Sequence, residues 1–341
     1  MMPIRLSIVV PCYNEEEVLP ETSKRLVGLL ARLRDLSLVT DDSAVYFVDD
    51  GSKDKTWPLI TALAISTNGA VHGIKLSRNQ GHQSALLAGL FDAPGDAVVT
   101  IDADLQDDVN VIEEMVRCHQ LGCDIVLGVR KSRRADTVFK RLSAQSYYRL
   151  LGFLGVNAVY NHADYRLMSR RAIDSLRRFS EVNLFLRGVI PLLGFPTTQV
   201  YYDRAERLAG QSKYPLRRML ALALDGITSF SVTPLRFIAA LGFLICLGSI
   251  CMIGWVLYGA LYLQGTVPGW ASSVLPVYFL GGIQLLSIGV LGEYVAKTYL
   301  ETKRRPRYFV EAVAELGPER PIADIRKPAH ANTASESIGP A

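Results

Sequence analysis

Short apolar runs alternate with longer amphipathic stretches along the first 130 residues of the chain. Runs rich in β-branched residues predict five strands, at Leu6–Cys12, Val45–Asp50, Val71–Leu76, Ala97–Asp102 and Asp124–Val129. Stretches of helical length and period lie between them, at Glu15–Leu33, Lys55–Ile65, Gly81–Phe91 and Val109–Gln120. This alternation predicts a mostly parallel, Rossmann-like sheet with helices on both faces. Ligands of such sheets bind at the carboxyl ends of the strands.

The alternation continues beyond a basic stretch of helical character at residues 137–153. Asp164–Met168 and Thr198–Ala205 have the composition of strands, and Leu184–Leu193 between them is expected to be a helix. Residues 1–214 are numerous enough to bury one substantial core. We therefore expect a single α/β domain over this part of the chain.

A long uncharged stretch distinguishes the C-terminal part, since no Asp, Glu, Lys or Arg occurs from Phe237 to Gly292. Two segments here, residues 235–263 and 274–299, are long enough to span a membrane. An uncharged turn that contains Pro268 and Gly269 joins them. Together they predict a transmembrane hairpin over residues 234–300. A buried helical hairpin in a globular core is the alternative interpretation.

Basic residues flank this hairpin on both sides, and the turn within it has none. Because positive residues mark the cytoplasmic side, both termini and the α/β domain are expected in the cytosol, with a multi-pass membrane topology. Residues 215–233 combine an apolar and a basic face, as an interfacial helix does, although a core-facing surface helix has the same pattern. Residues 301–341 are expected to be a cytoplasmic basic segment followed, after Leu316, by a disordered tail.

Composition supports this division of the chain. The 341 residues carry a net charge of +4, and 49% are hydrophobic, with a mean hydropathy of +0.19. The charged residues are concentrated outside the hairpin, which excludes both a polytopic channel and a purely soluble enzyme. The basic segments flank a membrane hairpin, so anionic lipid head groups explain them better than nucleic acid does.

Acidic side chains follow two of the predicted parallel strands. Asp102 and Asp104 flank one residue at a strand end, where they can converge on a divalent cation that also binds substrate phosphates. Asp50, in Asp49-Asp50-Gly51-Ser52, can accept hydrogen bonds from a base or a ribose. A solvated turn or a helix cap is the alternative for each motif. Glycine-rich dinucleotide and P-loop fingerprints are absent from the sequence.

Four motifs occur in order and together resemble family 2 glycosyltransferases: Pro11-Cys12-Tyr13-Asn14-Glu15, Asp49-Asp50-Gly51-Ser52, Asp102-Ala103-Asp104-Leu105-Gln106 and Gly210-Gln211-Ser212-Lys213-Tyr214. The string from Asn79 to Ala85 strengthens the resemblance, which runs from about Leu6 to Val310. Within the family, the chain is similar to the polyprenyl-phosphate glycosyltransferases. It is most similar to bacterial and phage-type enzymes with a two-helix hairpin that make undecaprenyl-phosphate glucose.

This resemblance implies a GT-A fold, an inverting transfer and a set of site residues. The implied nucleotide-sugar ligands are Pro11, Tyr13, Glu15, Asp50, Asp102, Ala103, Arg207 and Lys213. Asp104 and Gln106 would hold Mg²⁺ or Mn²⁺ at the donor diphosphate. Arg130, with Arg207 and Lys213, would bind phosphate groups, and Asp164 would lie near the acceptor. Asp164 would orient the sugar or act as a base, or it would simply pair with Arg166 or Arg170.

The implied reaction transfers a hexose from a nucleotide sugar to undecaprenyl phosphate, with glucose as the leading candidate for the sugar and UDP-glucose for the donor. It would take place at the bacterial inner membrane and serve the modification of cell-envelope glycans such as O-antigen. A phosphate monoester acceptor has a second pKa near 6 and is mostly dianionic at pH 7, so no strong general base is required. Transfer of mannose or a modified aminoarabinose is an alternative, as is a non-catalytic scaffold that binds nucleotide sugars. The chain is also a possible homo-oligomer.

Overall fold

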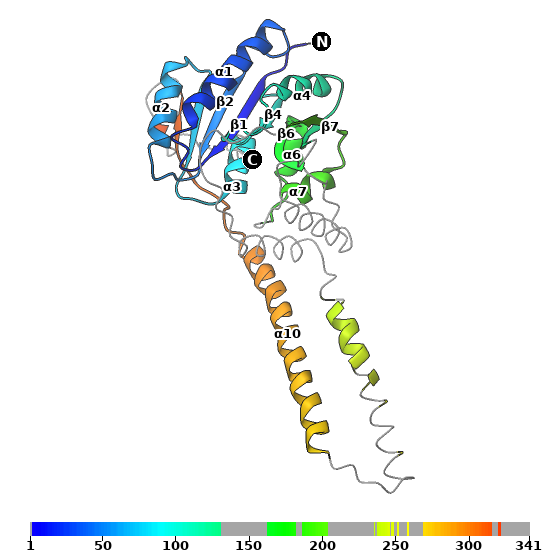
Figure 1. Cartoon of the computed structure of the whole chain (residues 1–341). Helices are drawn as coiled ribbons and strands as arrows, with labels where there is room; N and C mark the ends of the chain where they lie inside the picture. The colour runs from blue at the N-terminus through cyan, green and yellow to red at the C-terminus, as the bar shows by residue number, and fades with distance from the viewer. Residues whose placement is uncertain are drawn as a thin grey trace, which may run out of the picture.

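The computed structural model describes residues 2–130, 162–181, 186–203, 269–315 and 320–321, with scattered positions between 235 and 258. The described part consists of a nine-stranded sheet with helices packed on it and one long helix, α10, that extends away from the sheet (Figure 1). The strand order is β7-β5-β6-β4-β1-β2-β3-β8-β9.

The middle of the sheet is parallel, as the sequence predicts. It contains β1 (Leu6–Cys12), β2 (Ala44–Asp49), β3 (Val71–Leu76) and β4 (Ala97–Thr100), with β1 between β2 and β4. Every residue of β1, β2 and β4 is buried. Such continuous burial is typical of a parallel sheet whose two faces are both covered.

Helices cover both faces of this sheet. On one face, α1 (Leu19–Asp35), α2 (Thr56–Ser66) and α4 (Val111–Gln120) pack against alternate β1 residues such as Ile8 and Val10. On the other face, α3 (His82–Asp92), α6 (Arg170–Leu176) and α7 (Leu186–Val189) pack around Val9 and Val48. The period of two along a strand sends neighbouring side chains to opposite cores.

A second group of strands continues the sheet beyond β4. β6 (His162–Ser169) is antiparallel to both β4 and β5 (Ile125–Arg130), and β7 (Thr197–Tyr202) is parallel to β5. The two strands predicted here are therefore confirmed. The predicted helix at Leu184–Leu193 is helical where the structure describes it, as α7 and a 3₁₀ turn at Ile190–Leu193. β4 ends at Thr100, so Asp102 belongs to the following loop rather than to the strand.

The sequence did not predict the strands that follow the C-terminal apolar helix. β8 (Val310–Ala314) pairs antiparallel with β3, and β9 (Arg320–Pro321) pairs with β8. The predicted disorder after Leu316 is thus wrong at Arg320 and Pro321, because the edge of β8 offers these residues backbone hydrogen-bond partners. The edge of β3 is closed by a segment that follows it by more than two hundred residues.

α10 (Trp270–Thr302) contains the second predicted span, and the stretch Phe279–Lys303 is long and apolar enough to cross a membrane. None of its most apolar window is buried against the described chain. Phe279, Leu285 and Ile288 are each more than 60% exposed. The predicted basic helix at 137–153 and the interfacial helix at 215–233 lie outside the described residues, as does most of the first span.

α10 ends close to the carboxyl end of β3. The Ser77 N–H donates to the Phe309 carbonyl (2.9 Å), directly before β8 begins. The Arg307 guanidinium donates to the carbonyls of Phe179 and Glu181, at 2.6 and 2.7 Å. The segment that follows α10 is therefore tied to the end of β3, at the edge of the sheet where ligands of parallel α/β folds bind.

Candidate active site

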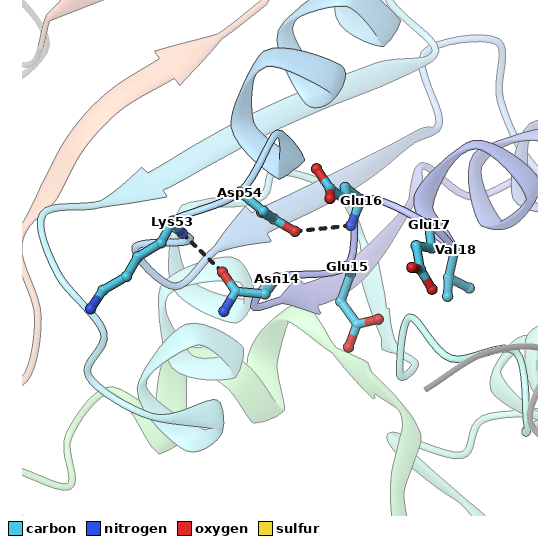
Figure 2. Close-up of a pocket in the computed structure, with 7 residues that line it drawn as sticks. All are labelled: Asn14, Glu15, Glu16, Glu17, Val18, Lys53 and Asp54. Carbon is cyan, nitrogen blue, oxygen red and sulfur yellow. Dashed lines mark hydrogen bonds between the residues drawn. The ribbon is translucent and has the colours of Figure 1, made fainter. Parts of the chain in front are cut away.

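The loops after β1 and β2 are joined by hydrogen bonds, as Figure 2 shows in part. The Lys53 N–H donates to Asn14 Oδ1 (2.9 Å), and the Glu16 N–H donates to Asp54 Oδ2 (3.3 Å). The Asn14 N–H in turn donates to Ser52 Oγ (2.9 Å). These loops line a hollow of about 410 Å³ with mostly acidic walls. Of the expected nucleotide ligands, Glu15 lines this hollow.

The other expected ligands from β1 lie in and directly after the strand. Pro11 is buried within β1, whereas the Tyr13 side chain is 41% exposed. An exposed aromatic ring at the end of a parallel strand is suited to stack against a flat base. The cysteine between them, Cys12, is buried, and burial raises the pKa of its thiol.

Asp50 is almost completely buried, and it holds the loop after β3. Its two carboxylate oxygens accept hydrogen bonds from the N–H groups of Gln80 (2.7 Å) and Gly81 (2.9 Å). Burial raises the pKa of Asp50, although these two hydrogen bonds oppose the shift. Asp50 therefore fixes the start of α3, whose first residue is His82. If Asp50 also contacts the base or the ribose of the nucleotide, as the sequence predicts, its carboxylate must accept that hydrogen bond in addition to these two.

The loop after β4 presents the acidic motif. Thr22 of α1 donates its hydroxyl hydrogen to the Ala103 carbonyl (2.8 Å), and the Gln106 N–H donates to Asp104 Oδ1 (3.2 Å). Leu105 between them has a φ of +54°. The left-handed conformation of Leu105 turns the chain sharply. This turn allows the Gln106 N–H to reach the Asp104 carboxylate.

This loop fits a divalent cation that is shared with a substrate. Oδ1 of Asp102 is buried and accepts no hydrogen bond, although His82 Nε2 lies 3.5 Å from it, and the neighbouring Asp104 and Gln106 add further oxygen atoms. The described residues contain no group of three or more His, Cys, Asp or Glu side chains placed to hold a metal ion. Mg²⁺ is typically held by one or two carboxylates together with substrate phosphates. The donor set therefore matches an ion that binds with its substrate.

Asp164 lies beside this loop, because β6 is antiparallel to β4. The register that pairs Thr100 with Arg166 places Asp164 at the same edge as Asp102. Oδ1 of Asp164 pairs with Arg166, and Oδ2 accepts a hydrogen bond from Arg187 (2.9 Å). Of the two arginines suggested from the sequence, Arg166 is the partner and Arg170 is not, because the Arg170 side chain donates to the carbonyls of Ala93 and Gly95.

His82 bridges the two acidic groups. Its Nε2 lies 3.5 Å from Asp102 Oδ1 and 3.6 Å from Asp164 Oδ2. Burial favours the neutral ring, but the two carboxylates outweigh it and raise the pKa of His82. Burial also raises the pKa of Asp102, to about 6. For Asp164, burial is outweighed by His82, Arg187 and Arg166, which hold its pKa well below the usual range.

The Arg130 side chain forms an ion pair with a buried aspartate, Asp107. Its guanidinium donates to Asp107 Oδ1 (3.2 Å) and to the Tyr202 hydroxyl (3.3 Å). The Tyr202 hydroxyl donates to the same Asp107 oxygen (2.6 Å). Asp107 is 3% exposed. These three residues connect the loop after β4 with the ends of β5 and β7.

Replacement of Tyr202 by Phe is expected to lower the free energy of unfolding by about 2 kcal/mol, since it removes a hydrogen bond to a buried carboxylate. Tyr201→Phe is the matched control, because the adjacent Tyr201 is 53% exposed and bonds only to Gln199 among the contacts described. Its effect is expected to stay within about 0.5 kcal/mol. Denaturant unfolding in detergent measures both, and equal effects would contradict the buried network.

The structure thus brings together the loops after β1, β2 and β4 and the start of β6. Arg207 and Lys213 lie outside the described residues. Arg187, Asp107 and Tyr202 were not predicted as site residues. The string Asn79-Gln80-Gly81-His82 was the one sequence signal that pointed to His82.

A mostly parallel sheet with helices on both faces and acidic loops at its carboxyl edge is the GT-A arrangement of a glycosyltransferase. Residues 7–177 match the family described as "Glycosyl transferase family 2". The "Uncharacterized glycosyltransferase YkoT" of Bacillus subtilis (strain 168) is 50% identical over 90% of this chain and 91% of that protein. The chain therefore belongs to glycosyl transferase family 2.

Two further similarities add detail. The "Bactoprenol glucosyl transferase" of Shigella phage SfV is 39% identical over 90% of this chain and 98% of its own length. Among solved structures, glucosyl-3-phosphoglycerate synthase from Mycobacterium tuberculosis, in complex with Mn²⁺, UDP and phosphoglyceric acid, aligns over 66% of this chain and 76% of that one. Its TM-score is 0.42 and its identity 21%, which is too distant to transfer ligands.

Proposed function

We propose that this glycosyltransferase moves glucose from UDP-glucose to undecaprenyl phosphate, with inversion at the anomeric carbon. The near-full-length similarity to a bactoprenol glucosyl transferase supports both the sugar and the polyprenyl acceptor. The observation that carries most weight in the structure is the position of α10. The segment directly after this helix is tied by Phe309 to Ser77, at the same edge of the sheet as the acidic loops, and by Arg307 to Phe179 and Glu181.

The proposed donor site is the edge formed by the loops after β1, β2 and β4. Tyr13 would stack on the uracil ring, and the loop from Asp102 to Gln106 would lie along the ribose and diphosphate. Asp104 and Gln106 would hold Mg²⁺ or Mn²⁺. When bound, such an ion stabilises the negative charge that develops on the leaving nucleoside diphosphate.

The remaining residues supply position and charge. Arg130, held by Asp107 and Tyr202, keeps a guanidinium close to the loop after β4. The acceptor phosphate is mostly dianionic at pH 7 and attacks without a strong base. Charged and polar groups that are already in place before the reaction usually make the greatest contribution to lowering such a barrier.

The proposed membrane arrangement is a hairpin over residues 234–300 with the α/β domain on the cytoplasmic side of the bacterial inner membrane. β8 follows α10 and pairs with β3, which precedes the hairpin, so both flanks belong to one domain. They must lie on the same side of the membrane, which requires an even number of crossings. Residues 215–233 would lie in the interface between the two, and a homo-oligomer is compatible with this arrangement.

The test uses the purified full chain in detergent with UDP-[¹⁴C]glucose, undecaprenyl phosphate and Mg²⁺. Label is expected in the organic phase, and alkaline phosphatase treatment before the reaction should abolish it by removing the acceptor phosphate. Parallel reactions with labelled GDP-mannose and UDP-aminoarabinose test the alternative sugars. Absence of lipid-linked label with every donor would contradict the proposed function.

A further inference from the structure

Asp164 is surrounded by two arginines in different environments. Arg187 of α7 approaches both oxygens of the carboxylate, through Nη2 at 2.9 Å from Oδ2 and Nε at 3.3 Å from Oδ1. Arg166 of β6 pairs with Oδ1 from the other side. A carboxylate that meets a planar guanidinium through two nitrogens fixes its orientation as well as its charge.

Exposure separates the roles of these two arginines. The Arg166 side chain is 1% exposed, whereas the Arg187 side chain is 39% exposed and that of Asp164 is 14% exposed. Arg166 therefore balances the charge of Asp164 from inside the protein. Arg187 lies on the open side of the carboxylate, and the three groups together keep one net positive charge.

This positive group lies across from the donor loop. Asp164 is connected to Asp102 through His82, whose Nε2 is within 3.6 Å of both carboxylates. In an inverting transfer, the acceptor attacks the anomeric carbon from the side opposite the leaving diphosphate. With the diphosphate along the loop from Asp102 to Gln106, the acceptor phosphate approaches from the β6 and α7 side, where the described part of the chain presents Arg187 as a partly exposed cation.

The same contacts make Asp164 unsuited to act as a base. Both of its oxygens already accept hydrogen bonds from guanidinium groups, and its low pKa keeps it ionised. A proton acceptor works best when its pKa is near the operating pH. A phosphate dianion has no proton that must be removed before attack, so the reaction gives Asp164 no proton to accept.

We propose that Arg187 binds the phosphate monoester of the acceptor, and that Asp164 is the positioning residue that holds the Arg187 guanidinium toward it. This inference rests on the proposed function, because it assigns the acceptor subsite of the same reaction. The nucleotide-sugar diphosphate is the other phosphate in the reaction, and separate titrations of the two substrates distinguish them. Asp164 then acts through Arg187 and does not contact the reacting atoms.

The experiment measures initial rates for the purified full chain while undecaprenyl phosphate and UDP-glucose are varied in turn. Arg187→Gln is expected to raise the KM for undecaprenyl phosphate about 30-fold, the range for loss of a charge-assisted hydrogen bond. The KM for UDP-glucose should remain unchanged, which also shows that the variant is folded. Arg187→Lys keeps the charge and is expected to recover part of the affinity.

Asp164→Asn should reproduce the higher KM for the lipid, because a neutral amide no longer holds the guanidinium. Combining it with Arg187→Gln should add little further effect, since both changes remove the same contact. Arg171→Gln is the matched control. Like Arg187, Arg171 pairs with an aspartate, in this case Asp124. The Arg171 side chain is 64% exposed, and Arg171 lies in the first turn of α6, at the end of β6 opposite to Asp164.

Three results would overturn the proposal. One is an unchanged KM for undecaprenyl phosphate in both Arg187 variants. Another is a rise in the KM for UDP-glucose alone, which would assign Arg187 to the donor diphosphate. The third is a loss of kcat in Asp164→Asn with unchanged KM values, which would make Asp164 a catalytic base. Failure of the wild-type chain to glycosylate the lipid would instead contradict the proposed function.

Discussion

Replacement of Asp104 by Ala is expected to lower kcat for transfer to the lipid by about 10³-fold, because loss of charge stabilisation at a leaving group has effects of this size. Asp104 lies in the loop after β4, where it accepts a hydrogen bond from Gln106, and it is two residues from the buried Asp102 oxygen. Without its carboxylate, the loop loses one of the oxygen ligands that would hold the metal at the donor diphosphate. Initial rates at saturating substrates and Mg²⁺ measure the effect.

Asp108→Asn is the matched control for this prediction. Asp108 is exposed and accepts hydrogen bonds from the Asn110 backbone and side chain at the start of α4, a function that an amide oxygen also serves. Its kcat should stay near that of the wild type. Binding of Mn²⁺ in the presence of UDP, followed by calorimetry, should weaken in Asp104→Ala and persist in Asp108→Asn. A wild-type rate in Asp104→Ala would remove this residue from the site.

Gly51→Val is expected to lower the free energy of unfolding by about 3 kcal/mol, from left-handed backbone strain and steric overlap together. Gly51 has a φ of +67°, and a Cβ atom there would lie 2.6 Å from backbone atoms of Arg78 and Asn79. This overlap would push the loop after β2 away from the loop after β3. The hydrogen bonds from Gln80 and Gly81 to Asp50 would then weaken, and His82 would move with them.

The Tm of this variant in detergent should fall by about 10 °C. Gly69→Val isolates the steric part of the effect, because Gly69 also has a positive φ (+88°) but a Cβ atom added there would meet no other atom within 4 Å. Gly69→Val should therefore lose only the stability that backbone strain costs, about 1–2 kcal/mol. Equal losses of Tm in the two variants would show that contact between the loops after β2 and β3 is unimportant for stability.

The sheet was predictable because its strands carry a local signal. β1 to β5 are short apolar runs bounded by turn residues, and each lies within a few residues of its expected position. β8 has no such signal, because its five residues include Glu311 and its partner β3 lies far away in the sequence. An edge strand of this kind is defined by the strand it pairs with rather than by its own composition.

Only part of the candidate site could be predicted from such local sequence signals. Asp50, Asp102 and Asp104 lie in motifs at the ends of strands, where the fold itself brings side chains together. His82 and Arg187 carry no comparable signal, since their partners Asp102 and Asp164 become neighbours only through the antiparallel insertion of β6 between β4 and β5. Their interactions depend on tertiary contacts that the local pattern does not contain.

The pairing of β8 with β3 also dictates an order of events during synthesis. β3 is complete by Leu76, but its edge partner follows α10 and begins at Val310. The ribosome must therefore produce the whole stretch between residues 76 and 310, α10 included, before this edge can close, and until then β3 exposes unpaired backbone groups that favour aggregation. Completion of the sheet therefore depends on synthesis of α10, so a chain that stalls before Val310 would carry an unfinished sheet.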